Sequence, residues 1–128
     1  MTTPTTQLDK KIALFQKLAL SFEGALEASH MGQPEFRLNS RVFATLAAQS
    51  QGCGMIKLTA DQQTFFTTEQ PSVFSPVPGG WGKIGCTHVH LLAADEAILH
   101  GGLSTAFHNL QMKQAAKKPA RSRHSRND

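Results

Sequence analysis

The chain has 128 residues, which favours one domain with a hydrophobic core of its own. Hydrophobic residues make up 40% and charged residues 17%, as in folded globular proteins, and no run approaches the ~20 apolar residues that a membrane span needs. Residues 113–128 hold six Lys or Arg and one Asp (net +5), and residues 1–112 hold seven Lys or Arg and eight Asp or Glu (net −1), so the body has no overall positive field to attract a polyanion.

The N-terminal residues 1–7 are polar, and residues 7–23 have helical periodicity. Residues 1–7 lack a basic region followed by an apolar run, so we expect a flexible N-terminus without a secretory signal, in a cytoplasmic protein. Residues 7–23 predict a helix, with Gly24 as its stop. Its apolar residues recur at spacings of three and four: Leu8, Ile12, Phe15, Ala19 and Phe22.

The period then changes to two, which indicates strands. Alternating side chains predict short strands at 26–29, 35–38 and 41–46, joined as antiparallel hairpins by turn residues. The turn at 49–52, with sequence QSQG, precedes a further strand at 53–58.

Thr59 and Gln62 form a capping-box pattern at the start of a helix over about 60–69, which Pro71 ends. We expect this helix to bury Phe65, with Phe66 as a second candidate. Residues 71–85 are too rich in Pro and Gly for more than a short edge segment.

The last predicted elements are a strand with sequence CTHVHLL and a helix from Ala94 or Asp95 to about residue 112. The apolar face of this helix comprises Ile98, Leu99, Leu103, Ala106, Phe107 and Leu110. Residues 113–128 have no apolar face and predict a basic, disordered tail. Together the elements predict a two-layer α+β domain over 8–112, an antiparallel sheet packed against N- and C-terminal helices.

The stretch PGGWGKIGCTHVHL, residues 78–91, contains the lettering GxGxxG of a dinucleotide-binding loop. That fingerprint requires a preceding strand and a following helix whose N-terminus binds the pyrophosphate. Here SPVP precedes it and a predicted strand follows, so we interpret the glycines as architecture that folds the loop against the sheet and presents or buries Trp81.

Cys86, His88 and His90 alternate, and zinc accepts these ligand types. Successive same-face positions on a strand are ~7 Å apart, so the three cannot converge on one ion by themselves, and we predict neither a metal nor a cofactor. Cys53 and Cys86 are expected to be buried, reduced thiols, although the sequence leaves a disulfide between them open.

The sequence predicts no catalytic site. Ser29 and His30 are adjacent, so on a strand they point to opposite faces and cannot form a local nucleophile–base pair. If the protein were an enzyme, Ser29, His30 and His88 would be the first candidates, in a deep pocket that holds titratable groups in contact.

Basic residues on the predicted sheet and loop suggest a binding patch. Arg37 and Arg41 flank a turn, Lys57 lies on the next strand, and Trp81 and Lys83 occupy the glycine-rich loop. Together they would suit phosphate contacts and base stacking. The alternative is a solvated sheet face whose charges prevent edge pairing.

Several stretches in combination resemble the MmcQ/YjbR-like family of small bacterial proteins, over about residues 8–112. They are SHMGQPEFRLNSRVFATL (29–46), GMIKLTADQQTFF (54–66), PSVFSPVPGGWGKIGCTHVHL (71–91) and the closing AADEAIL helix. The resemblance implies a double-wing α+β fold with some likeness to frataxin-type folds, and the DNA-binding label that this family usually carries. The matching positions are Ser29, His30, Gly32, Pro34, Phe36 and Arg37, and Gly79, Gly80, Trp81, Gly82, Gly85 and Thr87.

Two functions follow as hypotheses. The first is a non-enzymatic module that binds DNA weakly and in a salt-sensitive way through the basic patch, with the tail adding affinity. The second is a protein- or small-ligand-binding module that uses a groove between the PGGWG loop and the Ser29–Arg37 hairpin. The oligomeric state is left open.

Overall fold

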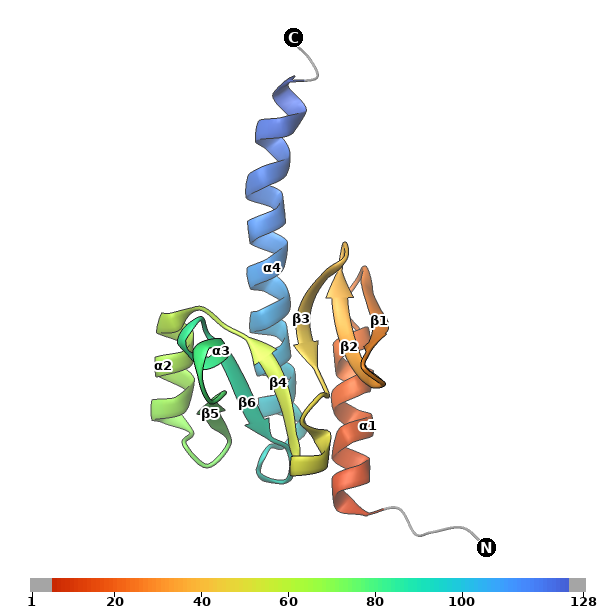
Figure 1. Ribbon diagram of the computed structural model, residues 1–128, viewed down its shortest axis with the longest axis vertical. Helices are drawn as coiled ribbons and strands as arrows, with labels where there is room; N and C mark the ends of the chain where they lie inside the picture. Colours follow the sequence, from red (N-terminus) through yellow and green to blue (C-terminus); the bar gives the residue numbers. More distant parts are fainter. Residues whose placement is uncertain (1–5, 125–128) are drawn as a thin grey trace, which may run out of the picture.

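The computed structural model describes the backbone of residues 6–124 and side chains up to Ala116 (Figure 1). The helices are α1 (Gln7–Leu20), α2 (Ala60–Glu69), α3 (Gly80–Lys83) and α4 (Glu96–His124). The strands are β1 (Ala25–His30), β2 (Gln33–Leu38), β3 (Arg41–Thr45), β4 (Cys53–Lys57), β5 (Phe74–Pro76) and β6 (Cys86–His90). None of the described helices is long and apolar enough to cross a membrane.

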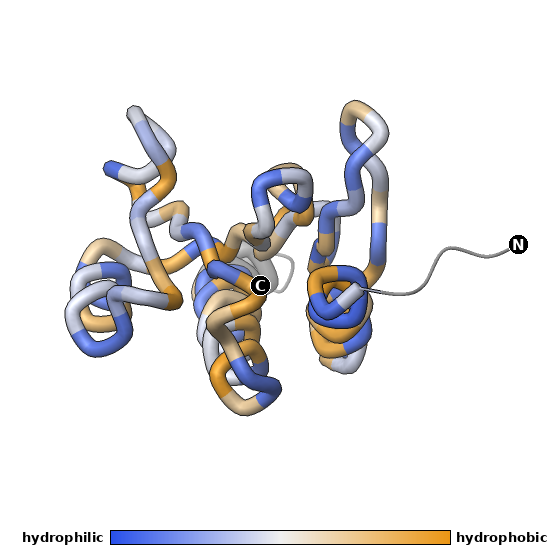
Figure 2. The backbone as a smooth tube through the Cα atoms, turned by 90° about the horizontal axis from the view of Figure 1, so that it is seen from below, coloured by the Kyte–Doolittle hydropathy of each residue, from blue (hydrophilic) through white to orange (hydrophobic). Residues whose placement is uncertain are grey.

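The six strands form one antiparallel sheet in the order β1-β2-β3-β4-β6-β5. The long helices α1 and α4 lie on the same side of this sheet (Figure 2). The predicted two-layer α+β architecture is therefore confirmed, and the short turns between β1, β2 and β3 form the predicted hairpins.

The sheet is nearly divided in two at its centre. β3 and β4 pair only through Ala44–Ile56 and Thr45–Met55, whereas β4 and β6 pair along their whole length. We call β1, β2 and β3 the N-terminal wing, and β4, β6 and β5 the C-terminal wing. α4 runs behind the division and extends well beyond the sheet (Figure 1).

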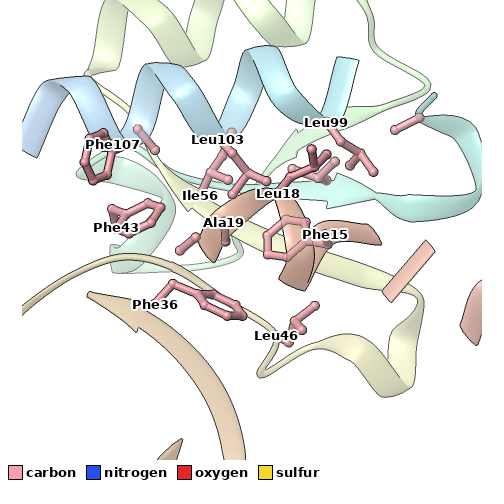
Figure 3. Close-up of a cluster of buried hydrophobic side chains, with 14 of the residues drawn as sticks. Phe15, Leu18, Ala19, Phe36, Phe43, Leu46, Ile56, Leu99, Leu103 and Phe107 are labelled. Carbon is pink, nitrogen blue, oxygen red and sulfur yellow. The ribbon is translucent and has the colours of Figure 1, made fainter. Parts of the chain in front are cut away.

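The core lies between the sheet and the helices, and aromatic rings fill much of it (Figure 3). Phe15 from α1 and Phe36 from β2 are fully buried with ring centroids 6.1 Å apart. Phe107 from α4 stacks on Phe22 at 4.9 Å and meets Phe43 edge-on at 5.3 Å. These contacts fix α1 and α4 against the N-terminal wing.

Polar side chains start the helices where the sequence predicts. Thr59 and Gln62 form the reciprocal capping box of α2, with N–O distances of 3.0 and 3.2 Å. Asp95 accepts a hydrogen bond from the Ile98 amide at the start of α4. α1 begins with a capping box between Thr6 and Asp9, so the expected flexibility of residues 1–7 is wrong for 6 and 7, and residues 1–5 lie outside the described residues.

Two further expectations about α1 and α2 are wrong. α1 ends at Leu20 rather than 23, because the chain turns through Ser21 into Gly24, whose φ is +89°. Phe65 is 60% exposed, because α2 packs on the narrow edge strand β5, and Phe66 fills that contact, 5.0 Å from the ring of Phe74.

The last helix does not end at residue 112, and the predicted disorder after it is wrong for the backbone of 113–124, which is helical. Gln, Ala and Lys favour helix, and neither Gly nor Pro occurs between Gly102 and Pro119. Gln114 also ties the helix to the N-terminal wing, because its side chain donates to Leu38 O (2.9 Å) and accepts from Asn39 (2.8 Å). Residues 125–128 lie outside the described part.

Candidate binding groove between the wings

A groove of about 450 Å³ opens where β3 and β4 separate, and we call it the wing groove. Residues of α4 form its floor, and β3 and the β4–α2 connection form its walls together with the end of the glycine-rich loop. The described residues that line it are Val42, Phe43, Lys57, Leu58, Thr59, Ile84, Cys86, Ala106, Asn109, Leu110, Met112 and Lys113.

The lining of the wing groove is apolar and positively charged. Its charged residues are Lys57 and Lys113, both exposed, and it contains no acidic residue. The only ion pair among the described side chains joins Arg37 to Glu35, so neither lysine has an acidic partner there. Ile84 and Met112 are 67% and 58% exposed, which is a large apolar surface for a site open to water.

The two neutral polar side chains of the lining already have partners. The side chains of Asn109 and Gln62 exchange two hydrogen bonds at 2.6 and 3.0 Å. The Thr59 hydroxyl accepts a hydrogen bond from the backbone N–H of Gln62. A ligand in the wing groove would therefore meet apolar surface and ammonium groups rather than unpaired amides.

The glycine-rich loop beside the groove owes its shape to two of its glycines. A Cβ atom on Gly82 would lie 1.9 Å from the Val77 carbonyl oxygen, and one on Gly85 would lie 1.9 Å from that of Leu58. Gly80 has open space around it, and β6, a strand, follows Gly85. The GxGxxG lettering thus reflects close backbone packing, and Trp81 is presented with 63% of its surface exposed.

Gln63 holds this loop in place, a role that was not predicted from the sequence. Its side-chain amide lies 3.0 Å from both Gly82 O and Cys86 O and 3.2 Å from the Thr87 hydroxyl. Thr87 is fully buried and donates to Gly85 O. A glutamine within a predicted helix gives no sequence signal for such a contact.

Replacing Gln63 with alanine should lower the free energy of unfolding by about 1–3 kcal/mol, because its hydrogen bonds to two carbonyl oxygens and to the buried Thr87 hydroxyl are lost while the carbonyls keep only their backbone donors. Chemical denaturation followed by the fluorescence of Trp81, the single tryptophan, measures this directly. Gln70→Ala at the end of the same helix is the matched control and should cost less than about 0.5 kcal/mol. Equal effects of the two substitutions would remove Gln63 from this role.

The predicted basic patch is only partly assembled. Lys57 lines the wing groove, and Arg41 is exposed directly before the groove residue Val42. Arg37 is bonded to Glu35 on its own strand, with Nε 2.6 Å from the carboxylate, so its charge is largely neutralised. Lys83 is exposed beside Ile84.

The predicted groove between the PGGWG loop and the Ser29–Arg37 hairpin is not formed. Ser29 and His30 lie at the end of β1, the outermost strand of the N-terminal wing, and two strands separate β2 from β6. The observed groove instead uses β3, and it retains only the loop end at Ile84.

Sequence reasoning also missed the floor of the wing groove. Ala106, Asn109, Leu110 and Lys113 follow the spacing i, i+3, i+4, i+7, so they share one face of α4. This face continues the core stripe past the point where the sheet covers it. Ala106 and Leu110 were predicted for the core face of this helix, and the predicted end at about residue 112 left only Lys113 outside it.

The alternating residues of β6 do not form a metal centre. Among the described residues, no group of three or more His, Cys, Asp and Glu side chains is arranged to hold a metal ion. Cys53 and Cys86 are free and buried, as predicted. In the β4–β6 ladder, Cys53 lies directly across from His90 at one end, and Cys86 lies directly across from Lys57 at the other. Burial, aided by the neighbouring His90, lowers the pKa of His88.

Comparison of the chain with protein-family models, with curated proteins and with solved structures finds no match.

Proposed function

We propose that this protein binds nucleic acid through the wing groove, with the basic end of α4 adding affinity. The observation that carries the proposal is a 450 Å³ groove whose described lining has two lysines without acidic partners and no carboxylate. The resemblance to MmcQ/YjbR-like proteins, with their DNA-binding label, supports the same function. The helix that forms the floor also leads directly into the basic residues 113–128.

In this function the charged and apolar parts of the groove have separate roles. Lys57, Lys113 and the adjacent Arg41 contact phosphates, which positions the strand without reading its sequence. Exposed Ile84 and Met112, with Trp81 and Lys83 on the neighbouring loop, contact bases or sugars. Because the body has a net charge of −1, binding to it is local and weak.

Binding should depend steeply on salt. If the groove contacts two or three phosphates of a duplex, its affinity should fall roughly tenfold to fortyfold between about 50 and 200 mM salt. Fluorescence anisotropy with labelled single-stranded and duplex oligonucleotides measures this for the full chain and for a chain ending at Ala116. That shorter chain keeps the Gln114 contacts but loses five cations, so it should bind more weakly and with a shallower slope.

Two outcomes would contradict the proposal. If neither the full chain nor the shorter chain binds at low salt, nucleic acid is ruled out as a partner of this surface. Binding by the full chain alone would show that the basic end acts as a generic polycation and that the wing groove has another function.

The volume of the wing groove supports a second candidate, a small-ligand-binding module. Sites for small molecules commonly have volumes of roughly 300–1,000 Å³ and mostly apolar walls, and here the two lysines would favour an anionic ligand. A thermal-shift screen of metabolites on the chain ending at Ala116 tests this candidate. A reproducible rise in melting temperature that Lys57→Glu abolishes would favour it, and a flat screen would count against it.

A further inference from the structure

A cysteine, a histidine and a serine form a hydrogen-bonded chain in the C-terminal wing. Cys53 Sγ lies 3.5 Å from His90 Nδ1, and His90 Nε2 lies 2.9 Å from Ser75 Oγ. Cys53 is the direct partner of His90 across β4 and β6, and Ser75 lies on β5 at the other side of β6. The three side chains therefore come from three adjacent strands, and these strands give the cluster a rigid support.

The Cys53–His90–Ser75 cluster lies on the side of the sheet opposite the long helices. Ile56 and Val89 on the same strands are core residues, and side chains alternate between the two faces of a strand. Cys53 and His90 alternate with them and so point to the opposite face. This cluster is separate from the wing groove, whose lining contains neither residue.

The two ring nitrogens of His90 can have different roles. With its proton on Nε2, the ring donates to the Ser75 hydroxyl, and Nδ1 at 3.5 Å is a closer acceptor for the Cys53 S–H than Gln51 O at 3.8 Å. A thiol, a base in contact with it and a third group that orients the base are the parts of a cysteine nucleophile. Ser75 is then a positioning residue that acts through His90.

We propose that Cys53 is a nucleophilic thiol, that His90 is its general base, and that small disulfides are its substrates. Cys53 is only 4% exposed, so its sulfur is closed to polypeptide disulfides and the proposal is confined to small ones. A disulfide suits it because sulfur reacts readily with sulfur and because the exchange needs no further oxidant. The product is a mixed disulfide on the side of the sheet opposite the long helices.

The exchange balances within the named groups. As Cys53 Sγ attacks one sulfur of R–S–S–R, its proton passes to His90 Nδ1, the new S–S bond forms and the old one breaks. The departing RS⁻ takes the proton back from His90 and leaves as RSH. Cys53 and one RS group are now joined as a disulfide, the other RS group is reduced to a thiol, and excess RSH reverses the reaction.

Cys86 provides a comparison within the same molecule. Burial raises the pKa of both thiols, and Lys57 partly offsets this for Cys86 alone. Cys86 also lines the wing groove. If thiolate abundance or access through the groove decided the rate, Cys86 would react first, whereas a base in contact with the thiol gives Cys53 the higher rate.

The test is the rate at which the folded full chain releases thiopyridone from dithiodipyridine. Cys86→Ser should keep the fast phase and Cys53→Ser should lose it. In the Cys86→Ser background, His90→Gln should slow the reaction by at least about tenfold, and the matched change His88→Gln should alter it by less than about twofold. Ser75→Ala should slow Cys53 without slowing Cys86 in the same molecules, and Ser75→Thr should restore the rate.

Controls separate this chemistry from local unfolding. Each variant is compared by its melting temperature, and in denaturant every thiol that a variant retains should react at the same rate. A faster Cys86, or a Cys53 rate that His90→Gln leaves unchanged in a folded variant, would overturn the proposal.

Discussion

Replacement of Gly85 by alanine is expected to lower the free energy of unfolding by at least about 3 kcal/mol. The φ angle of Gly85 is +106°, which side-chain-bearing residues rarely adopt, and its Cβ would lie 1.9 Å from the Leu58 carbonyl oxygen. Gly85 O also accepts a hydrogen bond from Leu58 N at 3.1 Å. The segments next to β4 and β6 therefore cannot move apart to make room for a Cβ without losing this backbone contact. Urea denaturation followed by circular dichroism measures the loss.

Gly80→Ala is the matched control in the same loop. Gly80 has open space where a Cβ would be and begins the short helix α3, so the change in stability should stay within about 0.5 kcal/mol. This pair distinguishes the architectural interpretation of GxGxxG from a ligand-binding one. Similar losses at both positions would contradict the packing argument.

Reversing the charge of both groove lysines, Lys57→Glu with Lys113→Glu, should weaken nucleic-acid binding by at least about tenfold. Two phosphate contacts are lost, so the slope of log affinity against log salt should become shallower by about two. Both side chains are exposed and lack acidic partners among the described residues, so stability should change by less than about 1 kcal/mol. Anisotropy titrations at several salt concentrations give both quantities.

The control changes the net charge equally at another place. Lys10 and Lys17 are exposed on α1, and the double variant Lys10→Glu with Lys17→Glu should reduce affinity by less than about threefold. If both double variants bind equally weakly, affinity follows net charge and the wing groove is not the contact surface.

Local sequence signals predicted much of the fold because they act within a few residues. The capping pairs Thr59–Gln62 and the period-two runs of the first three strands each depend on neighbours in the chain. The burial of Cys53 and Cys86 also followed from their apolar surroundings. The two-layer arrangement then followed from short turns between strands and a helix at each end.

The site depended on tertiary packing that such signals do not contain. The wing groove exists because β3 and β4 pair only at Ala44–Ile56 and Thr45–Met55, and no residue pattern announces that separation. The exposure of Phe65 reflects the narrow strand under α2, and the partnership of Cys53 with His90 depends on strand register over 37 residues. The sequence alone identified Lys57 as a candidate binding residue, but it could not show that Lys57 and Lys113 line the same groove.

The most direct test of nucleic-acid binding by the wing groove is a nuclear magnetic resonance titration of the full chain with a short oligonucleotide. We expect the signals of Val42, Lys57, Ile84 and Met112 to shift together, at the same midpoint as signals from the basic end, and we expect salt to reverse the shifts. Shifts confined to residues 117–128, with the groove signals unmoved at saturation, would contradict this expectation.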